Sequence, residues 1–239
     1  MKLNQDLPFS IVISRNDGTS SRSIATRVRA FSRHTHPFKD SDYFLSTLKG
    51  DSGLLFSAEL KTSGECVGSV RIETNAKDRF YFENEVRTVD LEARVVSICA
   101  SRLTATEGQL GTLVKLALVK ALYLYAHATQ SSYVYAFVDR ARLRLYRNLG
   151  FEPAISGNPD LELLCHGKLP MQLVKSDVDN FQSILEARQN SLSDFFFKTR
   201  HPDLKVFSSV GSLSETRRSY DFTAGSPPNI SRLLPTPTV

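Results

Sequence analysis

A short glycine-containing segment stands between a predicted strand and a strongly apolar predicted helix. Gly108 and Gly111 allow close backbone approach to a ligand, and the start of the helix offers unpaired N–H groups and the positive end of its dipole. This arrangement can hold a pyrophosphate or a phosphopantetheine phosphate, although a Gly-x-x-Gly segment before a helix is also an ordinary turn. Arg102, at the end of the strand, could bind a phosphate or a carboxylate bidentately, or form a structural ion pair. The candidate binding residues are Arg102, Leu103, Gly108, Gln109, Leu110, Gly111 and Thr112.

Other reactive side chains are less specific. Cys99 could be a nucleophile that forms an acyl-enzyme, but a small residue on a central strand is more often part of the core. His34 and His36 have no third ligand at a suitable spacing, so we predict no metal site. Three acidic residues precede the central strand and could either reach its end as a general base or be solvated: Glu83, Glu85 and Glu92.

The elements that would position these residues include a βαβα unit. Apolar patterns predict strands at 9–14, 54–60, 66–73, 93–103, 132–138 and 168–175, and helices at 21–33, 112–128, 139–149 and 177–190. Residues 34–52 and 104–111 are predicted loops. Asp139 is the expected N-cap of one helix and Gly150 its stop. Strands joined by a helix predict a parallel or mixed sheet, which binds ligands beyond the C-terminal ends of its strands.

The composition is that of a globular protein. The chain has 239 residues, of which 41% are hydrophobic and 23% charged, and we predict one domain over 1–207 and a flexible Ser/Pro-rich tail over 208–239. Three cysteines without a CxxC pair favour a reducing compartment. We expect a cytoplasmic protein without a transmembrane segment, because no secretory signal is visible and lysines interrupt the apolar stretch 113–126. The net charge of +5 favours acidic partners, but no nucleic-acid-binding pattern accompanies it.

The run Leu145–Phe151, LYRNLGF, follows a predicted strand. It resembles the tyrosine–helix–glycine–phenylalanine motif of the GNAT acyltransferase superfamily, and the resemblance in element order covers about residues 9–175. Ser101-Arg102-Leu103 and the long helix after it look like the branch of N-acyl amino acid synthases and acyl-homoserine lactone synthases. The resemblance implies a GNAT-like α/β (α+β) fold with a mixed central sheet flanked by helices.

The same resemblance implies an N-acyltransferase. Enzymes of that branch move a medium or long acyl chain from acyl carrier protein, or sometimes acyl-CoA, to the amine of an amino acid or a related small acceptor. The expected donor is therefore a phosphopantetheine thioester. Two positions depart from the branch: Cys99 stands where a glutamate is usual, and 108–112 matches the phosphate loop only in part, which fits a carrier protein better than coenzyme A.

Aminolysis of a thioester needs a neutral amine, a hydrogen-bond donor for the oxyanion and a proton for the departing thiolate. If strands 93–103 and 132–138 splay apart, backbone N–H groups near Cys99 and Ser101 could face the thioester carbonyl. Tyr146 could give its phenolic proton to the sulfur, or could simply be a packed aromatic residue of an amphipathic helix. Tyr146 and Cys99 are therefore the candidate catalytic residues.

Arginines recur on the helix that carries the tyrosine. Arg140, Arg144 and Arg147 are spaced i, i+4 and i+7, so the predicted helix places them on one face. The face could be merely solvated, or it could dock an acidic acyl carrier protein.

Two other functions stay open at this stage. One is an acetyl-CoA-dependent N-acetyltransferase, which needs no tunnel for a long acyl chain. The other is a non-catalytic GNAT-like scaffold that binds an acyl ligand or a partner; Cys99 in place of a glutamate supports it, and Tyr146 at the motif position argues against it.

Overall fold

The structure is a computed structural model that describes residues 3–15, 53–76, 79–84, 95–157, 159–162 and 170–206. The predicted helix over 21–33, the predicted loop over 34–52 and the predicted tail over 208–239 lie outside these residues, so the boundary between domain and tail stays a prediction.

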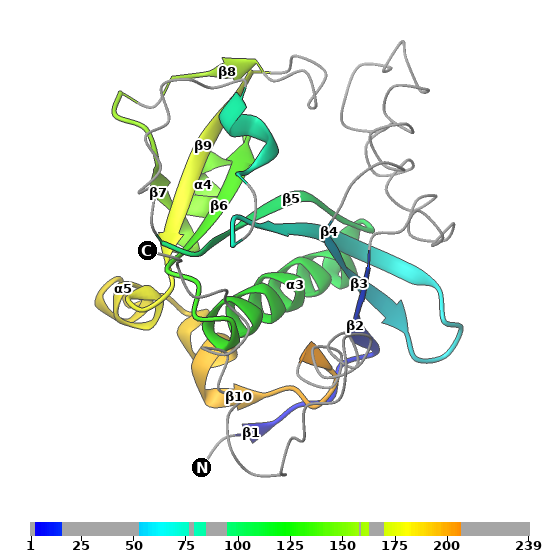
Figure 1. Ribbon diagram of the computed structural model, residues 1–239. Coiled ribbons are helices and arrows are strands. Elements are labelled where there is room, and N and C mark those ends of the chain that lie inside the picture. The colour runs from blue at the N-terminus through cyan, green and yellow to red at the C-terminus, as the bar shows by residue number, and fades with distance from the viewer. Residues whose placement is uncertain are drawn as a thin grey trace, which may run out of the picture.

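A mixed sheet forms the centre of the molecule (Figure 1). In the described part of the chain it has eight strands, seven of them in the order β2-β3-β4-β5-β6-β9-β7, with β8 also paired to β9. The strands are β2 (Phe9–Arg15), β3 (Leu54–Leu60), β4 (Cys66–Thr74), β5 (Ser97–Ala105), β6 (Tyr133–Val138), β7 (Glu152–Pro153), β8 (Leu161–Glu162) and β9 (Pro170–Asp177). The pair β5–β6 is parallel, and the neighbouring pairs are antiparallel. The expected mixed sheet flanked by helices is confirmed.

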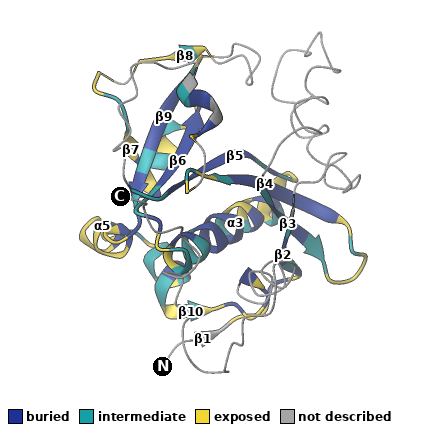
Figure 2. Ribbon diagram, in the orientation of Figure 1, coloured by how far each residue is buried: buried dark blue, intermediate teal, exposed yellow. Residues whose placement is uncertain are grey.

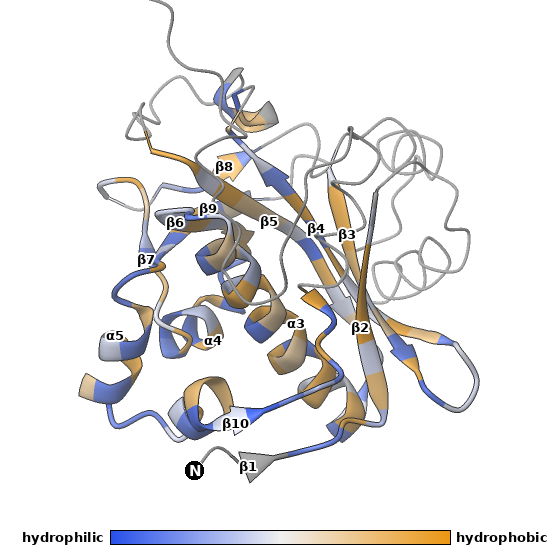
Figure 3. Ribbon diagram, turned by 60° about the horizontal axis from the view of Figure 1, so that its bottom comes forward, coloured by the Kyte–Doolittle hydropathy of each residue, from blue (hydrophilic) through white to orange (hydrophobic). Residues whose placement is uncertain are grey.

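The helices α3 (Gly108–Ala128), α4 (Leu143–Asn148) and α5 (Phe181–Ala187) lie on one side of the sheet (Figure 3). The long helix α3 contacts strands β2 to β6 and is buried along much of its length, whereas α4 and α5 are largely exposed (Figure 2). Gly68 on β4 permits this close packing. A Cβ atom at Gly68 would lie 2.4 Å from Cγ1 of Val114 on α3 and 2.8 Å from the carbonyl oxygen of Thr104.

Helix α3, with 21 residues, is also the one described helix that is long and apolar enough to cross a membrane. Half of its most apolar stretch is buried inside the fold. Core helices commonly have such a composition, so the helix is weak evidence for a membrane span.

Side chains alternate between two apolar cores along the central strands. Ile98 and Ala100 of β5 face α3 and belong to the main core. Cys99 points to the opposite side, into a smaller cluster. The buried members of that second cluster are Phe80, Phe82, Cys99, Tyr135, Phe137 and Leu173. Phe80 and Phe82 enter it from a short 3-10 helix, η1 (Tyr81–Asn84), and the residue before it. The period of two in a strand explains why β5, buried on both faces, serves both cores.

The C-terminal described segment returns to the N-terminus. After the π-helix η3 (Asp194–Lys198), strand β10 (Thr199–Arg200) pairs in parallel with β1 (Leu3–Asn4). Lys120 of α3 is buried, and its Nζ donates to the carbonyl oxygens of Phe195 at 2.5 Å and Thr199 at 2.6 Å. A core lysine thus connects α3 both to η3, through Phe195, and to β10, through Thr199.

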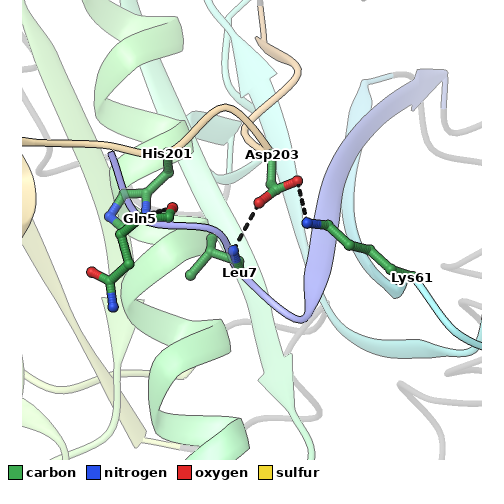
Figure 4. A network of polar contacts seen from close by, with 5 residues as sticks. All are labelled: Gln5, Leu7, Lys61, His201 and Asp203. Carbon is green, nitrogen blue, oxygen red and sulfur yellow. Dashed lines mark hydrogen bonds and ion pairs between the residues drawn. The ribbon is translucent and has the colours of Figure 1, made fainter. Parts of the chain in front are cut away.

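Polar contacts complete this closure (Figure 4). Asp203 accepts a hydrogen bond from the Leu7 N–H at 2.8 Å and forms an ion pair with Lys61 at 2.7 Å. The Nδ1 atom of His201 lies 3.0 Å from the carbonyl oxygen of Gln5, and the His201 ring packs against Phe195.

Several predicted boundaries were wrong by three or four residues. The central strand begins at Ser97 instead of residue 93 and continues to Ala105. Helix α3 begins at Gly108, so the predicted loop over 104–111 is reduced to Thr106 and Glu107. The helix predicted at 139–149 is only Leu143–Asn148, because Asp139 caps a turn instead, with its Oδ1 accepting from the Arg142 N–H at 2.9 Å. The last predicted helix, 177–190, is Phe181–Ala187.

The buried position of His201 predicts that the stability of the protein depends on pH. Burial lowers the pKa of His201, as does the charge of Lys120, against raising effects of the Gln5 carbonyl and Asp203. The folded protein therefore disfavours the imidazolium ion, and its free energy of unfolding should fall as the pH drops below about 6.5, the ordinary histidine pKa. We expect the urea midpoint to fall less between pH 7.5 and pH 5 in His201→Gln than in the natural protein; equal falls would contradict this role.

Candidate functional site

The β5–β6 ladder ends halfway along β5. The two strands pair from Ser97 with Tyr133 to Ala100 with Ala136. Beyond Ala100, β5 stays paired with β4 up to Ala105, while β6 stays paired with β9 up to Val138. The central strands therefore separate after four paired residues, as the splaying hypothesis required. In open sheets of this kind, ligands bind where neighbouring strands diverge at their C-terminal ends.

A β-bulge lies on β5 next to this separation. The β4–β5 register shifts so that Ser69 pairs with Thr104 and Arg71 with Ser101. The bulge contains Arg102, whose φ of 56° is in the left-handed region. A non-glycine residue there carries backbone strain of about 1–3 kcal/mol, and such strain gathers at functional sites. Arg102 is itself buried, so a ligand phosphate would have to enter the fold to reach its side chain.

The start of α3 follows directly on the bulged strand. The Thr106 N–H donates to the Val67 carbonyl at 2.8 Å, and Gly108 has a φ of 75°. Gly111 lies so close to the Thr106 carbonyl that a Cβ atom would be 1.7 Å from its oxygen, so only glycine fits. Glu107, at the N-cap, makes no side-chain capping hydrogen bond. The start of a helix carries the N–H groups and the positive dipole end that favour an anionic ligand, and phosphate binding at Gly108–Gly111 stays a prediction.

The remaining predicted binding residues differ in exposure. Gln109 and Thr112 are exposed, whereas Leu103 and Leu110 are half-buried. The Thr112 hydroxyl donates to the Gly108 carbonyl at 3.3 Å, so it stabilises the first turn of the helix. Gly108–Thr112 thus form the first turn of α3 rather than a loop before it.

Tyr146 lies on α4, which follows β6 on the other side of the separation. Gly150 has a φ of 83° and turns the chain, so that the Phe151 N–H donates to the Tyr146 carbonyl at 3.0 Å and the Phe151 ring packs edge-on against the Tyr146 ring at 5.2 Å. Burial raises the pKa of Tyr146 to about 12, with Arg142 lowering it and Asp139 raising it. The phenol therefore stays protonated at neutral pH and can act as a hydrogen-bond donor.

Cys99 is only 1% exposed and packs in the second, aromatic cluster. Such surroundings disfavour the thiolate, which is the reactive form of a cysteine nucleophile. Its position favours the alternative reading as a core residue. The next residue on that face, Ser101, is 6% exposed, and its Oγ has no hydrogen-bond partner among the described residues.

Two charged residues that the sequence reading missed lie beside these positions. Arg71 and Glu73 of β4 form an ion pair; Arg71 is opposite Ser101 and Glu73 is opposite Cys99. Their signal was present in the run VRIET, where two opposite charges at i and i+2 interrupt an otherwise apolar strand. Of the earlier candidate bases, Glu83 accepts a hydrogen bond from the Phe80 N–H, and Glu85 and Glu92 lie outside the described residues.

The predicted arginine face is only partly formed. Arg140 lies in the turn before α4 and forms an ion pair with Asp160 at 2.7 Å; Asp160 also accepts from Gln172. Arg144 and Arg147 lie on α4 and are exposed. Leu145, between them, is 45% exposed and is the large apolar residue that the described surface leaves most open.

No group of three or more His, Cys, Asp or Glu side chains suited to a metal gathers within the described residues.

Three solved structures share this fold at low sequence identity. FeeM, an N-acyl amino acid synthase from uncultured soil microbes, gives a TM-score of 0.57 at 16% identity and covers 78% of this chain and 98% of FeeM. The AHL synthase LasI gives 0.51 at 13% identity, over 75% of this chain and 95% of LasI. TofI, solved in a ternary complex with an inhibitor and MTA, gives 0.50 at 13% identity, over 74% of this chain and 96% of TofI.

No protein-family model matches the sequence, and no curated protein matches it either. The likeness therefore rests on the arrangement of the elements, which spans nearly the whole of each neighbour. The described chain has a GNAT-like fold that resembles the branch of N-acyl amino acid synthases and acyl-homoserine lactone synthases.

Proposed function

We propose that this protein is an N-acyltransferase that moves a medium or long acyl chain from a phosphopantetheine thioester to the amine of an amino acid or a similar small acceptor. The observation that carries the proposal is the separation of β5 from β6 after Ala100 and Ala136, with the start of α3 beyond one strand and Tyr146 beyond the other. This arrangement can receive a thioester between the start of a helix, which favours anions, and a hydrogen-bond donor.

The donor would be held by the start of α3. Its first-turn N–H groups and dipole favour a phosphate, and both acyl-CoA and acyl carrier protein present a phosphopantetheine phosphate. The named activities of FeeM and LasI support an acyl donor of this class. A cytoplasmic location, expected from the cysteine content, is part of the same proposal.

The reaction would proceed by direct attack of the amine on the thioester carbon. Backbone N–H groups near Cys99 and Ser101 would stabilise the oxyanion of the tetrahedral adduct, and collapse of the adduct would expel the thiolate. The Tyr146 pKa of about 12 lies above the ordinary thiol value of about 8.5, so full proton transfer from the phenol to the thiolate would be unfavourable. Tyr146 would therefore stabilise the departing sulfur by a hydrogen bond, and water would supply its proton.

The reaction class can be tested by mass spectrometry of new amides. The purified protein is incubated with amino acids and, separately, with palmitoyl-carrier protein, palmitoyl-CoA or acetyl-CoA, alongside Tyr146→Phe. We expect N-acyl amino acids from a long-chain donor, and a kcat about 10- to 100-fold lower in the variant, which loses one hydrogen bond to a charged sulfur. Its stability should be nearly unchanged, because the ring packing against Phe151 is kept.

The other outcomes of this assay are informative. Amide formation from acetyl-CoA alone would identify an acetyltransferase instead. No amide from any donor would favour the non-catalytic scaffold.

A matched pair of glycine variants tests the donor site. Gly108 and Gly157 have nearly equal φ values, 75° and 76°, and an added Cβ meets nothing within 4 Å at either position. Alanine should therefore cost the same free energy of unfolding at both, about 1–2 kcal/mol. Only Gly108→Ala places a methyl group at the start of α3, so only this variant should weaken donor binding, by roughly tenfold. Equal donor KM values in the two variants would argue against a donor phosphate at this position.

If the donor is an acyl carrier protein, we expect the exposed arginines of α4 to bind it. Arg144→Glu should raise the KM for acyl carrier protein roughly 5-fold at low salt, with a smaller effect at high salt, and should leave the KM for acyl-CoA unchanged. Arg200→Glu, a charge reversal at an exposed position of β10, is the control. If both reversals act alike, or if acyl-CoA is affected as strongly, α4 is not the docking surface.

A further inference from the structure

We propose that Glu73 of β4 binds the ammonium group of the acceptor and takes a proton from it, and that Arg71 positions the Glu73 carboxylate. This inference rests on the proposed function, because it assigns the acceptor side of the same site.

The sheet register places Glu73 at the site. Glu73 is directly opposite Cys99, and Arg71 is directly opposite Ser101. In an antiparallel pair, opposite residues project from the same face, with their Cβ atoms about 4.5–5.5 Å apart. Cys99 faces the second cluster, away from α3, so Glu73 and Arg71 project from that face too. The β5–β6 ladder ends at Ala100, between the two cross-strand pairs. The carboxylate therefore lies level with the point where the strands part.

The burial of these charges is costly for folding alone. The side chains of Arg71 and Glu73 are 5% and 14% exposed, and they form an ion pair with each other. Desolvation of two buried charges offsets most of their attraction, and apolar residues of similar volume often stabilise a protein as well or better. A charged pair on this strand is therefore better explained by a task at the site than by stability.

Ser101 adds an independent sign of a ligand on the same face. Its hydroxyl is buried without a hydrogen-bond partner in the described part of the chain. Leaving such a group unsatisfied costs about 1–3 kcal/mol, which a bound polar substrate would recover. The side chains of Arg71, Glu73 and Ser101 thus lie on one face of the sheet. The aromatic cluster that contains Phe80 and Tyr135 lies on the same face.

Other described carboxylates around the separation have different partners. Asp139 caps the turn before α4 and pairs with Arg142, and Asp160 pairs with Arg140. Glu83 accepts a hydrogen bond from the backbone of its own turn. Glu107 lies exposed at the start of α3, where the donor phosphate is expected. Glu73 is the carboxylate that the sheet itself carries at the point of separation.

The chemistry balances without another reactant. The acceptor ammonium transfers one proton to the Glu73 carboxylate, which later passes it to water. The neutral amine forms the C–N bond at the thioester carbon, and the C–S bond breaks as the thiolate leaves. The second amine proton is lost from the tetrahedral adduct to solvent, and the thiolate takes a proton from water. The net reaction gives an amide, a thiol and one proton.

Glu73→Gln removes the charge and keeps the shape. We expect kcat/KM for the acceptor to fall about 100-fold at pH 7, with donor KM unchanged. The deficit should shrink as the pH approaches the acceptor's own pKa, where the amine is neutral without help. It should also shrink for an amine of low pKa such as hydroxylamine. A merely structural role would lower activity by the same factor at every pH and for both amines, and would overturn the proposal.

Glu59→Gln is a matched control, because Glu59 is opposite Cys66 at the far end of the same hairpin, also half-buried on a strand. It should retain natural activity. If Glu73→Gln does not fold, Glu73→Asp serves instead, with a lower acceptor kcat/KM and an unchanged donor KM expected.

The two proposals fail separately. Amide formation by the natural protein with full activity in Glu73→Gln would overturn the role of Glu73 alone. No amide from the natural protein with any donor would overturn the proposed function, and the role of Glu73 with it.

Discussion

The structure depends on the unequal pairing of β5 with its two neighbouring strands. Along one edge it pairs with β4 from Ile98 to Ala105, and along the other it pairs with β6 for only four residues. The sheet is thereby split into a β2–β5 half and a β6–β9 half that share a short parallel seam. Each half ends in a helix: α3 begins just after β5, and α4 begins a few residues after β6. The short β5–β6 pairing therefore determines where the start of α3 and the helix α4 lie relative to each other at the candidate site.

Close packing of α3 keeps this geometry in place. The helix can lie against β4 only because Gly68 has no side chain, and its first turn can begin so soon after β5 only because Gly111 has none. A helix held farther from the sheet would carry its N-terminal N–H groups away from the end of β5. The two glycines thus connect the packing of the core to the position of the proposed anion site.

The sequence predicted the elements better than their ends. Apolar periodicity identified β2 to β6 and α3, since each buries a regular pattern. It missed where β5 ends and α3 begins, because Gly108 reads equally well as a loop residue and as the first residue of a helix. The shortening of α4 came from Asp139, whose capping preference is the same for a turn as for a helix. The predicted arginine face is therefore only partly formed, because helix periodicity does not apply to Arg140, which lies outside the helix, whereas Arg144 and Arg147 lie on it.

The candidate site was less predictable because its geometry is non-local. Tyr146, Gly150 and Phe151 form a contiguous motif, so their local arrangement could be anticipated from the sequence. The bulge at Arg102 and the pairing of Glu73 with Cys99 depend on a register between strands more than 20 residues apart, which no local pattern specifies. A cysteine at position 99 looked like the loss of a carboxylate. The register shows that the neighbouring strand carries one on the same face, so the chemistry of a sheet face has to be read across strands and not along one.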